Sequence, residues 1–365
     1  MDTQTPLSGT NRGRLSRHLK AVGAIAATFT PDRLRAAATL AGQLHDLGKY
    51  NPAWQDYIRG GSPVPHSIYG AIAAFDEGAM DAAIAILGHH SGLKDYLEFL
   101  ADMQSVTADD RAIAQLCRDR CEFPWEEALT RCKTYASARK LFSPTQCKTD
   151  TDVRMLFSAL IDGDRLDAAR LRVERRPELR QVLGRLPEMP EPTTAINRVR
   201  QAIAQDCINA APSPRGFFRL AVPTGGGKTR SGMLFALNHA VHHGMKRVVY
   251  VAPFCSILDQ TARNFRQWFG RDAVLESHSQ VRDTDDDRRI ASQRWDYPIV
   301  VSTFVGLFES LFGNTPRACR KLHALQDSVL IIDEVQSIPL GFVDPILAML
   351  KDLVDNWGVS VVLSS

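Results

Sequence analysis

The hydrophobic pattern of this chain changes period once, at the proline-rich, acidic stretch Leu186–Thr193. Between Arg14 and about Arg185, apolar residues recur three and four apart, which is the spacing of amphipathic helices. Beyond the stretch, short β-rich runs alternate with helical stretches, which predicts a parallel sheet with right-handed crossovers and helices on both faces. We therefore expect a multidomain chain, with an all-α domain at 1–188 and an α/β domain at 189–365, because 365 residues suffice for two cores.

The expected strands are short, rich in β-branched residues and bounded by turn residues. They lie at Phe217–Val222, Val248–Ala252, Ile299–Ser302, Val329–Ile332 and Val359–Leu363.

A glycine-rich turn, Val222-Pro-Thr-Gly-Gly-Gly-Lys-Thr229, follows the first of these strands and opens a helix. Such a turn exposes backbone amides that can hold phosphates at the positive end of the helix. We expect Lys228 to reach the β- and γ-phosphates and Thr229 to hold Mg²⁺. The usual phosphate-binding (P-loop) pattern, Gly-x-x-x-x-Gly-Lys-Ser/Thr, begins with glycine, whereas this chain has Val222 at that position. The predicted nucleotide-binding residues here are Thr224, Gly225, Gly226, Gly227, Lys228 and Thr229.

A second carboxylate pair supports a nucleotide site. Asp333 and Glu334 directly follow the apolar strand Val329–Ile332. Because parallel strands end at the same edge of a sheet, this pair is expected beside the glycine-rich turn. Asp333 would then hold Mg²⁺ and Glu334 would orient the attacking water, so the predicted ligands are ATP and Mg²⁺.

In the first half, His45 and Asp46 follow the apolar, alanine-rich run Ala36–Leu44. Imidazole and carboxylate suit divalent transition metals, and one carboxylate can bridge two of them. Gly48 is predicted to cap the helix and to allow a close approach at the site. Lys49 would place a cation beside any anion that the metals hold.

Further histidines and aspartates recur along the same helical region, at predicted inward positions or helix ends. The predicted metal ligands are His18, His45, Asp46, His66, His89, His90 and Asp164. For the last of these the stretch Leu160–Asp167 offers three candidates, Asp162, Asp164 and Asp167, and Asp164 is preferred over Asp162. Taken singly, each has an ordinary explanation as a core or capping residue.

The overall composition excludes little. A net charge of +3 is nearly neutral for this length, so nucleic-acid binding would depend on local grooves. No run of about eighteen apolar residues exists, so no membrane span is expected. The seven cysteines lack CxxC spacing and are typical of reduced thiols, which predicts a cytoplasmic protein. A zinc site is the alternative explanation of four of them, Cys117, Cys121, Cys132 and Cys147.

The ordered series His, His-Asp, His, His-His, Asp resembles the HD phosphohydrolase superfamily. The doublet within Gly88–Gly92 narrows the resemblance to the HD nuclease domain of CRISPR type I helicase–nucleases. The second half resembles the superfamily 2 helicase part of the same enzymes. There the residues are the Val-Pro-Thr-Gly turn, the run Ser256–Gln260 and the Asp-Glu-Val-Gln sequence that ends at Gln336.

This resemblance implies an all-α HD domain followed by a RecA-like P-loop domain. It implies two divalent transition ions (Mn, Fe, Ni or Co), with His45, Asp46, Lys49 and Glu334 as catalytic residues. Lys49 would neutralise the phosphorane. Loops at Tyr250–Phe254 and Val301–Thr303 would contact the backbone of single-stranded DNA.

The implied activity is metal-dependent cleavage of single-stranded DNA coupled to ATP-dependent 3′→5′ helicase action. Its partner would be the CRISPR RNA-guided surveillance complex Cascade, which opens an R-loop. The tail Val359–Ser365 resembles the start of a Ser-Ala-Thr helicase motif. We therefore expect that a second RecA-like lobe is absent and that this chain acts as a nuclease only.

Two other functions remain open at this point. One is an HD phosphohydrolase acting on nucleotides or cyclic phosphodiesters, with a regulatory P-loop domain. The other is a non-catalytic module that uses the metal centre for docking.

Overall fold

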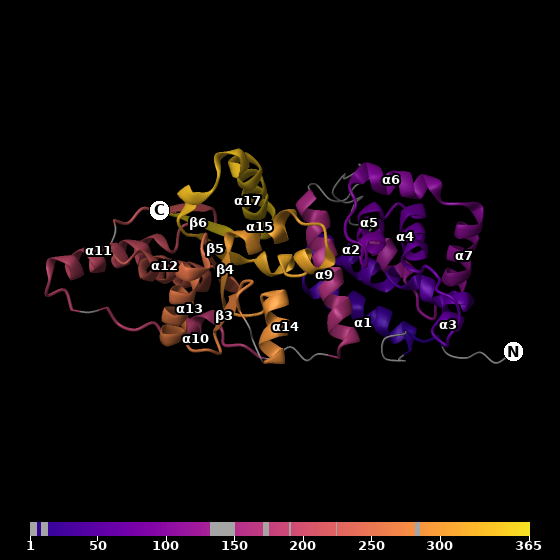
Figure 1. Ribbon diagram of the computed structural model, residues 1–365, viewed down its shortest axis with the longest axis horizontal. Coiled ribbons are helices and arrows are strands. Elements are labelled where there is room, and N and C mark those ends of the chain that lie inside the picture. Colours follow the sequence, from indigo (N-terminus) through magenta and orange to yellow (C-terminus); the bar gives the residue numbers. More distant parts are fainter. Residues whose placement is uncertain are drawn as a thin grey trace. The chain divides into compact units, whose positions relative to one another are not determined.

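The computed structural model describes residues 6–8, 14–131, 150–170, 175–189, 191–223, 225–281 and 285–365. The chain forms two compact units (Figure 1). The first comprises Met1–Val173 together with Gly313–His323, and the second comprises Glu174–Phe312 together with Ala324–Ser365. The first unit is helical and the second contains the sheet, so the predicted fold class is confirmed.

The helical unit is built from short, alanine-rich helices around one apolar core. Helices α1 and α2 cross where Gly23 meets Gly42, since a Cβ on Gly42 would lie 2.5 Å from the Gly23 Cα atom. The described elements are α1 (Leu15–Thr28), α2 (Asp32–Leu44), η1 (Leu47–Tyr50), α3 (Pro52–Tyr57), α4 (Ser67–Asp76), α5 (Met80–Gly88), α6 (Tyr96–Ser105), α7 (Ala108–Asp119), α9 (Asp150–Ala168) and α16 (Pro316–Cys319).

The short segment Gly313–His323 lies in sequence between two strands of the sheet, Ile299–Thr303 and Ser328–Ile332, but belongs to the helical unit. Its Arg320 guanidinium donates to Asp162 on α9 at 2.8 Å, and both side chains are buried. The Ser158 hydroxyl of α9 donates to the Arg320 carbonyl at 3.0 Å. Helix α9 is therefore held by residues from a distant part of the sequence.

The second unit is an α/β layer structure with a six-stranded, all-parallel sheet in the order β1-β6-β5-β2-β4-β3. The strands are β1 (Phe217–Leu220), β2 (Arg247–Ala252), β3 (Val274–Ser277), β4 (Ile299–Thr303), β5 (Ser328–Ile332) and β6 (Ser360–Ser364). Each predicted strand is present, and β3 is an additional one that the sequence analysis missed.

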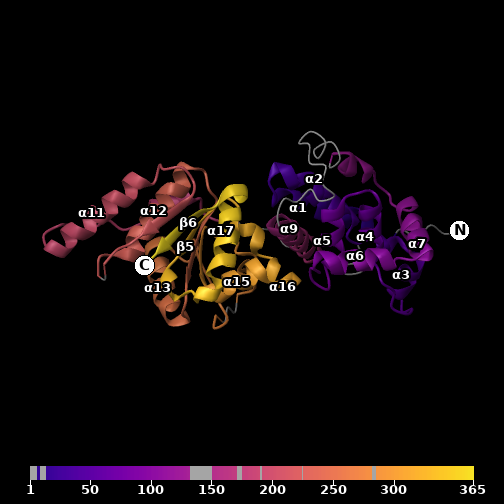
Figure 2. The ribbon, with the colours of Figure 1, turned by 90° about the horizontal axis from the view of Figure 1, so that it is seen from above.

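Helices cover both faces of this sheet, as Figures 1 and 2 show. Helices α12 and α13 lie on one side and α15 and α17 on the other. The helices are α10 (Leu179–Leu183), α11 (Ala195–Ala210), α12 (Lys228–His242), α13 (Cys255–Phe269), α14 (Asp286–Arg294), α15 (Phe304–Phe312) and α17 (Val343–Trp357). Strands covered on both faces are continuously apolar, as β2 and β5 are.

The two compact units do not follow the ranges 1–188 and 189–365 predicted for the domains. The second unit begins at Glu174, because Leu179 and Val182 lie on one face of α10 and pack into the core around the sheet. The return of Gly313–His323 to the helical unit was not expected either.

Among the described helices, none combines the length and apolar character that crossing a lipid bilayer requires.

Candidate metal centre and nucleotide site

The tight turn after α2 delivers two of the predicted ligands. Helix α2 ends at Leu44, His45 is its C-cap residue, and Asp46 leads into the 3-10 turn η1. The prediction that Gly48 caps the helix is wrong, because the chain turns three residues earlier and Gly48 lies inside η1. The predicted close approach is confirmed, since a Cβ on Gly48 would lie 2.1 Å from the His66 carbonyl oxygen.

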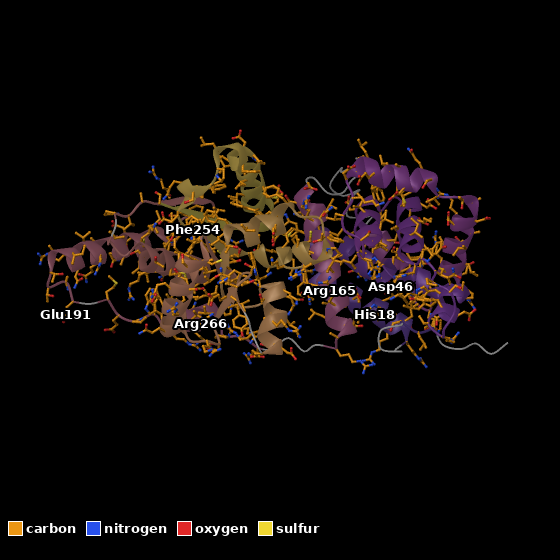
Figure 3. The ribbon with its side chains drawn as sticks, viewed as in Figure 1. His18, Asp46, Arg165, Glu191, Phe254 and Arg266 are labelled. Carbon is orange, nitrogen blue, oxygen red and sulfur yellow. The ribbon has the colours of Figure 1, made fainter. Side chains whose placement is uncertain are left out.

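All seven predicted ligand side chains come together around Asp46. The described residues offer one group made of Asp46, His66, His89 and His90, and a second made of His18, His45, Asp46 and Asp164. Within each group the ligand atoms lie within 4.8 Å of one another. Asp46 belongs to both groups, which is the arrangement expected of a carboxylate that bridges two ions. Figure 3 shows His18 and Asp46 side by side in the helical unit.

The two carboxylate oxygens of Asp46 face different histidines. Oδ1 lies 3.3 Å from His66 Nε2 and 3.6 Å from His89 Nε2. Oδ2 lies 3.3 Å from His45 Nε2 and 3.5 Å from His18 Nε2. Each oxygen thus faces a different pair of histidines.

The second ring nitrogen of three histidines is fixed by the surrounding helices. His45 Nδ1 donates to the Gly42 carbonyl at 2.8 Å, and His89 Nδ1 donates to the Ile86 carbonyl at 2.6 Å. His18 Nδ1 lies 2.7 Å from Asp167 Oδ2. Such bonds fix the tautomer, so the Nε2 lone pair of each ring points into the cluster as a metal requires.

Unpaired buried atoms test whether a metal ion fits here. Within the described part of the chain, His45 Nε2, His89 Nε2 and Asp46 Oδ1 are buried without a hydrogen-bond partner. Leaving such atoms unpaired is costly unless something else binds them. The donor set of imidazoles and carboxylates suits a divalent transition ion, so the residues fit the predicted pair of metals.

The electrostatics of the cluster are strongly coupled. Burial lowers the pKa of His18, but hydrogen bonds to Asp164 and Asp46 outweigh it and raise the pKa to about 10. Burial likewise opposes a raised pKa at His45, where the charges of the Asp46 and Asp164 carboxylates bring it to about 9. The same contacts overcome burial and hold the pKa values of Asp46 and Asp164 below the usual range. Cations are therefore favoured among these carboxylates.

Lys49 lies beside Asp46, and the two α9 aspartates between which the sequence left a choice, Asp162 and Asp164, have different partners. The Lys49 ammonium lies 2.5 Å from Asp46 Oδ2 and donates to the Ser8 carbonyl at 3.1 Å. Asp164 Oδ1 lies 3.4 Å from His18 Nε2, whereas Asp162 pairs with Arg320. Asp164 is thus the α9 carboxylate that lies in the cluster.

The predicted nucleotide residues gather at the carboxyl edge of the sheet. The Lys228 ammonium lies 3.0 Å from Asp333 Oδ1 and also contacts the Glu334 carboxylate. Burial lowers the pKa of Lys228, but these hydrogen bonds outweigh it and raise it. Phosphates bound here would compete with the carboxylates for this ammonium group.

The glycine-rich turn has the backbone that phosphate binding needs. Gly225 and Gly227 have φ angles of +81° and +84°, which glycine adopts readily. Gly226 lies between them, and Lys228 and Thr229 open α12. Thr224 lies outside the described residues. Phe254, labelled in Figure 3, follows β2 at this same edge and is 60 % exposed.

Asp167, the third candidate for the last carboxylate ligand, contacts His18 Nδ1 and is in neither group of ligand atoms. Two further residues touch the predicted nucleotide site without having been assigned a role. The Tyr250 hydroxyl donates to the Asp333 carboxylate. The Ser364 hydroxyl donates to Asp333 Oδ1 at 2.8 Å. Sequence spacing gives no signal for these last two contacts.

The alternative zinc site at the cysteines gains no support. Burial raises the pKa of Cys117 to about 12 and that of Cys121 to about 11, which disfavours the thiolates that bind zinc. Cys132 and Cys147 lie outside the described residues. Among the described residues, the candidate metal groups contain no cysteine.

Comparison with known proteins agrees with this arrangement. The family model for DEAD/DEAH box helicases matches residues 201–364. The CRISPR-associated nuclease/helicase Cas3 of Haloferax volcanii is 24% identical over 91% of this chain and 45% of its own length. This chain therefore spans about half the length of that curated relative.

Solved structures share the fold. The crystal structure of T. fusca Cas3 matches 99% of this chain and 51% of its own, with a TM-score of 0.60 and 15% identity. The structure of T. fusca Cas3 with ADP matches with a TM-score of 0.62 and 15% identity, over 99% of this chain and 50% of that chain. A chain in the structure of a CRISPR RNA-guided surveillance complex, pre-nicking, matches with a TM-score of 0.52 and 15% identity. The match covers 100% of this chain and 43% of that chain. With a cluster of histidines and aspartates of HD type ahead of a part that matches the helicase model, the chain is similar to the Cas3 nuclease/helicases in both of its parts.

Proposed function

We propose that this polypeptide cleaves single-stranded DNA at the Asp46-centred cluster in a metal-dependent reaction. The observation that carries the proposal is the shared position of Asp46 between two groups of ligand atoms, each within 4.8 Å. We assign His18, His45 and Asp164 to one ion, His66, His89 and His90 to the other, and Asp46 to both.

Two divalent ions held in this way supply an activated water and a positive field for the phosphoryl group. The side chains of the protein orient the ligand atoms and supply a further positive charge. His18, His45 and His89 are fixed in one tautomer by their second nitrogen, so their Nε2 atoms stay directed at the cluster. Lys49 supplies a buried ammonium beside Asp46, where it can neutralise negative charge that develops on the phosphate.

We further propose that the α/β unit is the first lobe of an ATP-dependent 3′→5′ DNA helicase. Lys228 would leave Asp333 and Glu334 for the β- and γ-phosphates, Asp333 would hold Mg²⁺, and Glu334 would orient water. The partner we propose is Cascade, acting on target DNA in type I interference. Support comes from the resemblance to the Haloferax volcanii relative, of which this chain covers 45%.

The decisive experiment incubates the chain with circular single-stranded DNA and Mn²⁺, with and without ATP. We expect cutting that needs the metal and persists without ATP, because the cluster lies within the helical unit alone. Replacement of Asp46 by alanine should abolish it.

Control reactions separate this function from its alternatives. Cutting that is unchanged in Asp46→Ala would contradict the proposal. Release of phosphate from a panel of nucleotides or cyclic phosphodiesters, with DNA left intact, would favour a nucleotide phosphohydrolase. Full metal occupancy without hydrolysis of any phosphoester would favour a docking role.

A further inference from the structure

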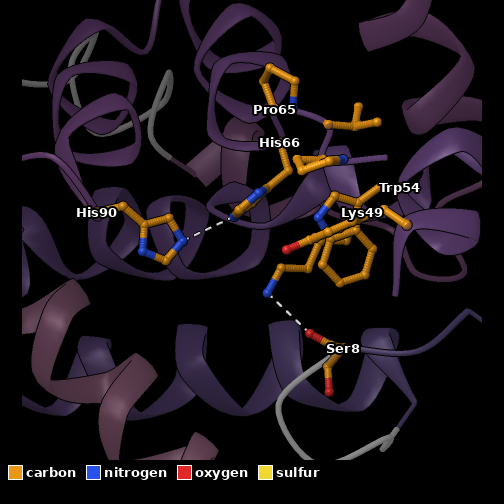
Figure 4. A pocket seen from close by; sticks show the side chains of 9 residues that line it. Ser8, Lys49, Trp54, Pro65, His66 and His90 are labelled. Carbon is orange, nitrogen blue, oxygen red and sulfur yellow. Dashed lines mark hydrogen bonds between the residues drawn. The ribbon is translucent and has the colours of Figure 1, made fainter. Parts of the chain in front are cut away.

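An open cavity of about 640 Å³ adjoins the metal centre in the helical unit (Figure 4). Its volume lies in the range of small-ligand sites, roughly 300–1,000 Å³. The lining residues come from the turn η1, helix α3 and the segment that leads into α4, with His90 at one side.

One end of the cavity is polar and belongs to the metal centre. His66 Nε2 and His90 Nε2 lie 3.0 Å apart there. Figure 4 shows Lys49 reaching the Ser8 carbonyl below them. This end carries the imidazoles and the ammonium that would face the phosphate of a bound strand.

The rest of the lining is mainly apolar and aromatic and includes Trp54, Tyr57, Val64 and Pro65. Trp54 is only 5 % exposed, because the Lys49 ammonium lies 5.1 Å from its ring centre and the His66 ring packs edge-on at 5.9 Å. Tyr57, the last residue of α3, is 39 % exposed. Tyr57 is therefore partly exposed where it lines the cavity, and the Trp54 ring packs edge-on against it with the ring centres 6.4 Å apart.

We infer that this cavity binds a base of single-stranded DNA against Tyr57, in the nucleotide next to the phosphate held at the metal centre. The inference rests on the proposed function and adds a substrate subsite to it. A nucleotide carries a charged phosphate and a flat aromatic base, and the lining offers cationic and imidazole groups for the first and an aromatic ring for the second. Stacking tolerates every base, so the subsite would hold the strand without selecting sequence.

Three variants isolate the stacking surface. Tyr57→Ala removes the ring and Tyr57→Phe keeps it. Tyr96→Ala is the matched control, because Tyr96 is a tyrosine of the same unit with 43 % exposure and does not line the cavity. Metal content and thermal unfolding should be the same in all of them, since Tyr57 is not one of the proposed ligands.

The first measurement needs no cleavage. A trinucleotide with 2-aminopurine is titrated into the metal-free protein, and quenching of its fluorescence reports stacking. We expect Tyr57→Ala to lose most of the quenching, while Tyr57→Phe and Tyr96→Ala keep it. Equal quenching in all variants would overturn the inference.

The second measurement compares two substrates in the presence of Mn²⁺, an ordinary oligodeoxynucleotide and an abasic one with the same backbone. On the ordinary oligodeoxynucleotide, Tyr57→Ala should lower kcat/KM about 5- to 100-fold, which is the loss expected for one stacked base. On the abasic substrate the same variant should lower kcat/KM less than about two-fold, because there is no base to stack. An equal loss on both substrates would contradict a base subsite. If the unaltered chain cuts no DNA, the proposed nuclease function fails, and the fluorescence titration alone decides the subsite.

Discussion

Asp46 joins the two halves of the metal cluster through its separate oxygens, and Asp162 provides a natural comparison. Both carboxylates are buried, but Asp162 is paired with Arg320 outside the cluster. We predict that Asp46→Asn prevents the tight binding of both Mn²⁺ ions, because it removes the shared charge. Asp162→Asn should still bind two ions, with a lower affinity, because the proposed ligands remain while α9 loses its ion pair with Arg320. Equilibrium dialysis with metal analysis measures the stoichiometry, and two tightly bound ions in Asp46→Asn would contradict the assignment.

Metal binding should also release protons. His18 and His45 have pKa values raised to about 10 and about 9, and a metal binds only the neutral imidazole. We predict that Mn²⁺ added near neutral pH acidifies an unbuffered solution, and that the affinity rises with pH toward about 9 to 10. An indicator dye measures the released protons. Affinity that is constant from pH 6 to pH 9 would contradict the raised values.

The folding stability of the metal-free protein should change with pH in the opposite direction to the metal affinity. A histidine pKa raised above its ordinary value of 6.5 adds stability that is fully present below 6.5 and is lost as the pH rises through 9 to 10. Urea unfolding with a chelator present should therefore show the metal-free helical unit becoming less stable over this window.

At the scale of elements, the hydrophobic period predicted most of the fold. A short continuous apolar run bounded by turn residues, such as Val329–Ile332, is typical of a strand buried on both faces, and the structure has one there. Strand β3 was missed because Val274–Ser277 contains Glu276, whose carboxylate is buried against Arg266 and His278. Local sequence shows a charged residue but not the distant partners that make its burial tolerable.

The choice between Asp164 and Asp162 as the metal ligand likewise depends on distant packing partners that the local sequence does not show. Residues two apart on a helix point to different sides, so the sequence could state the choice between them but not which side faces the histidines. That orientation depends on how α9 packs on α1 and on the segment Gly313–His323. The helical period contains no information about such packing partners.

The turn η1 depends on Gly48. A Cβ at this position would lie 2.1 Å from the His66 carbonyl oxygen, so the backbone would have to move. We predict that Gly48→Ala costs about 1–3 kcal/mol in the free energy of unfolding, as overpacking does. It should also weaken Mn²⁺ binding, because His66 would shift.

Gly163→Ala is the matched control for this turn. Its Cβ would lie 3.2 Å from the Val22 carbonyl, a tight contact that a small shift relieves. Urea unfolding and Mn²⁺ titration of the two variants make the comparison. A Gly48→Ala protein as stable as Gly163→Ala would show that the turn can adapt.

At the scale of the whole molecule, the compact helical unit is discontinuous in sequence. Asn314 exchanges two hydrogen bonds with the Leu93 backbone, through its carbonyl at 2.8 Å and its side-chain amide at 3.2 Å. Arg320 pairs with Asp162 on α9, the helix that also carries Asp164. A fragment of residues 1–188 has the predicted metal ligands but lacks this supporting segment.

We therefore predict that the fragment 1–188 binds Mn²⁺ more weakly than the full chain and exchanges the amide hydrogens of α9 faster. Removing one partner of a buried ion pair costs about 3–5 kcal/mol, and here the loss falls on the helix that positions Asp164. A synthetic peptide of residues 313–323 should restore binding, whereas the same peptide with Arg320→Ala should not. Hydrogen exchange and Mn²⁺ titration report the two effects. If the fragment alone matched the full chain in both measurements, the segment would be dispensable, and α9 would hold Asp164 in place through its contacts with α1 and α5.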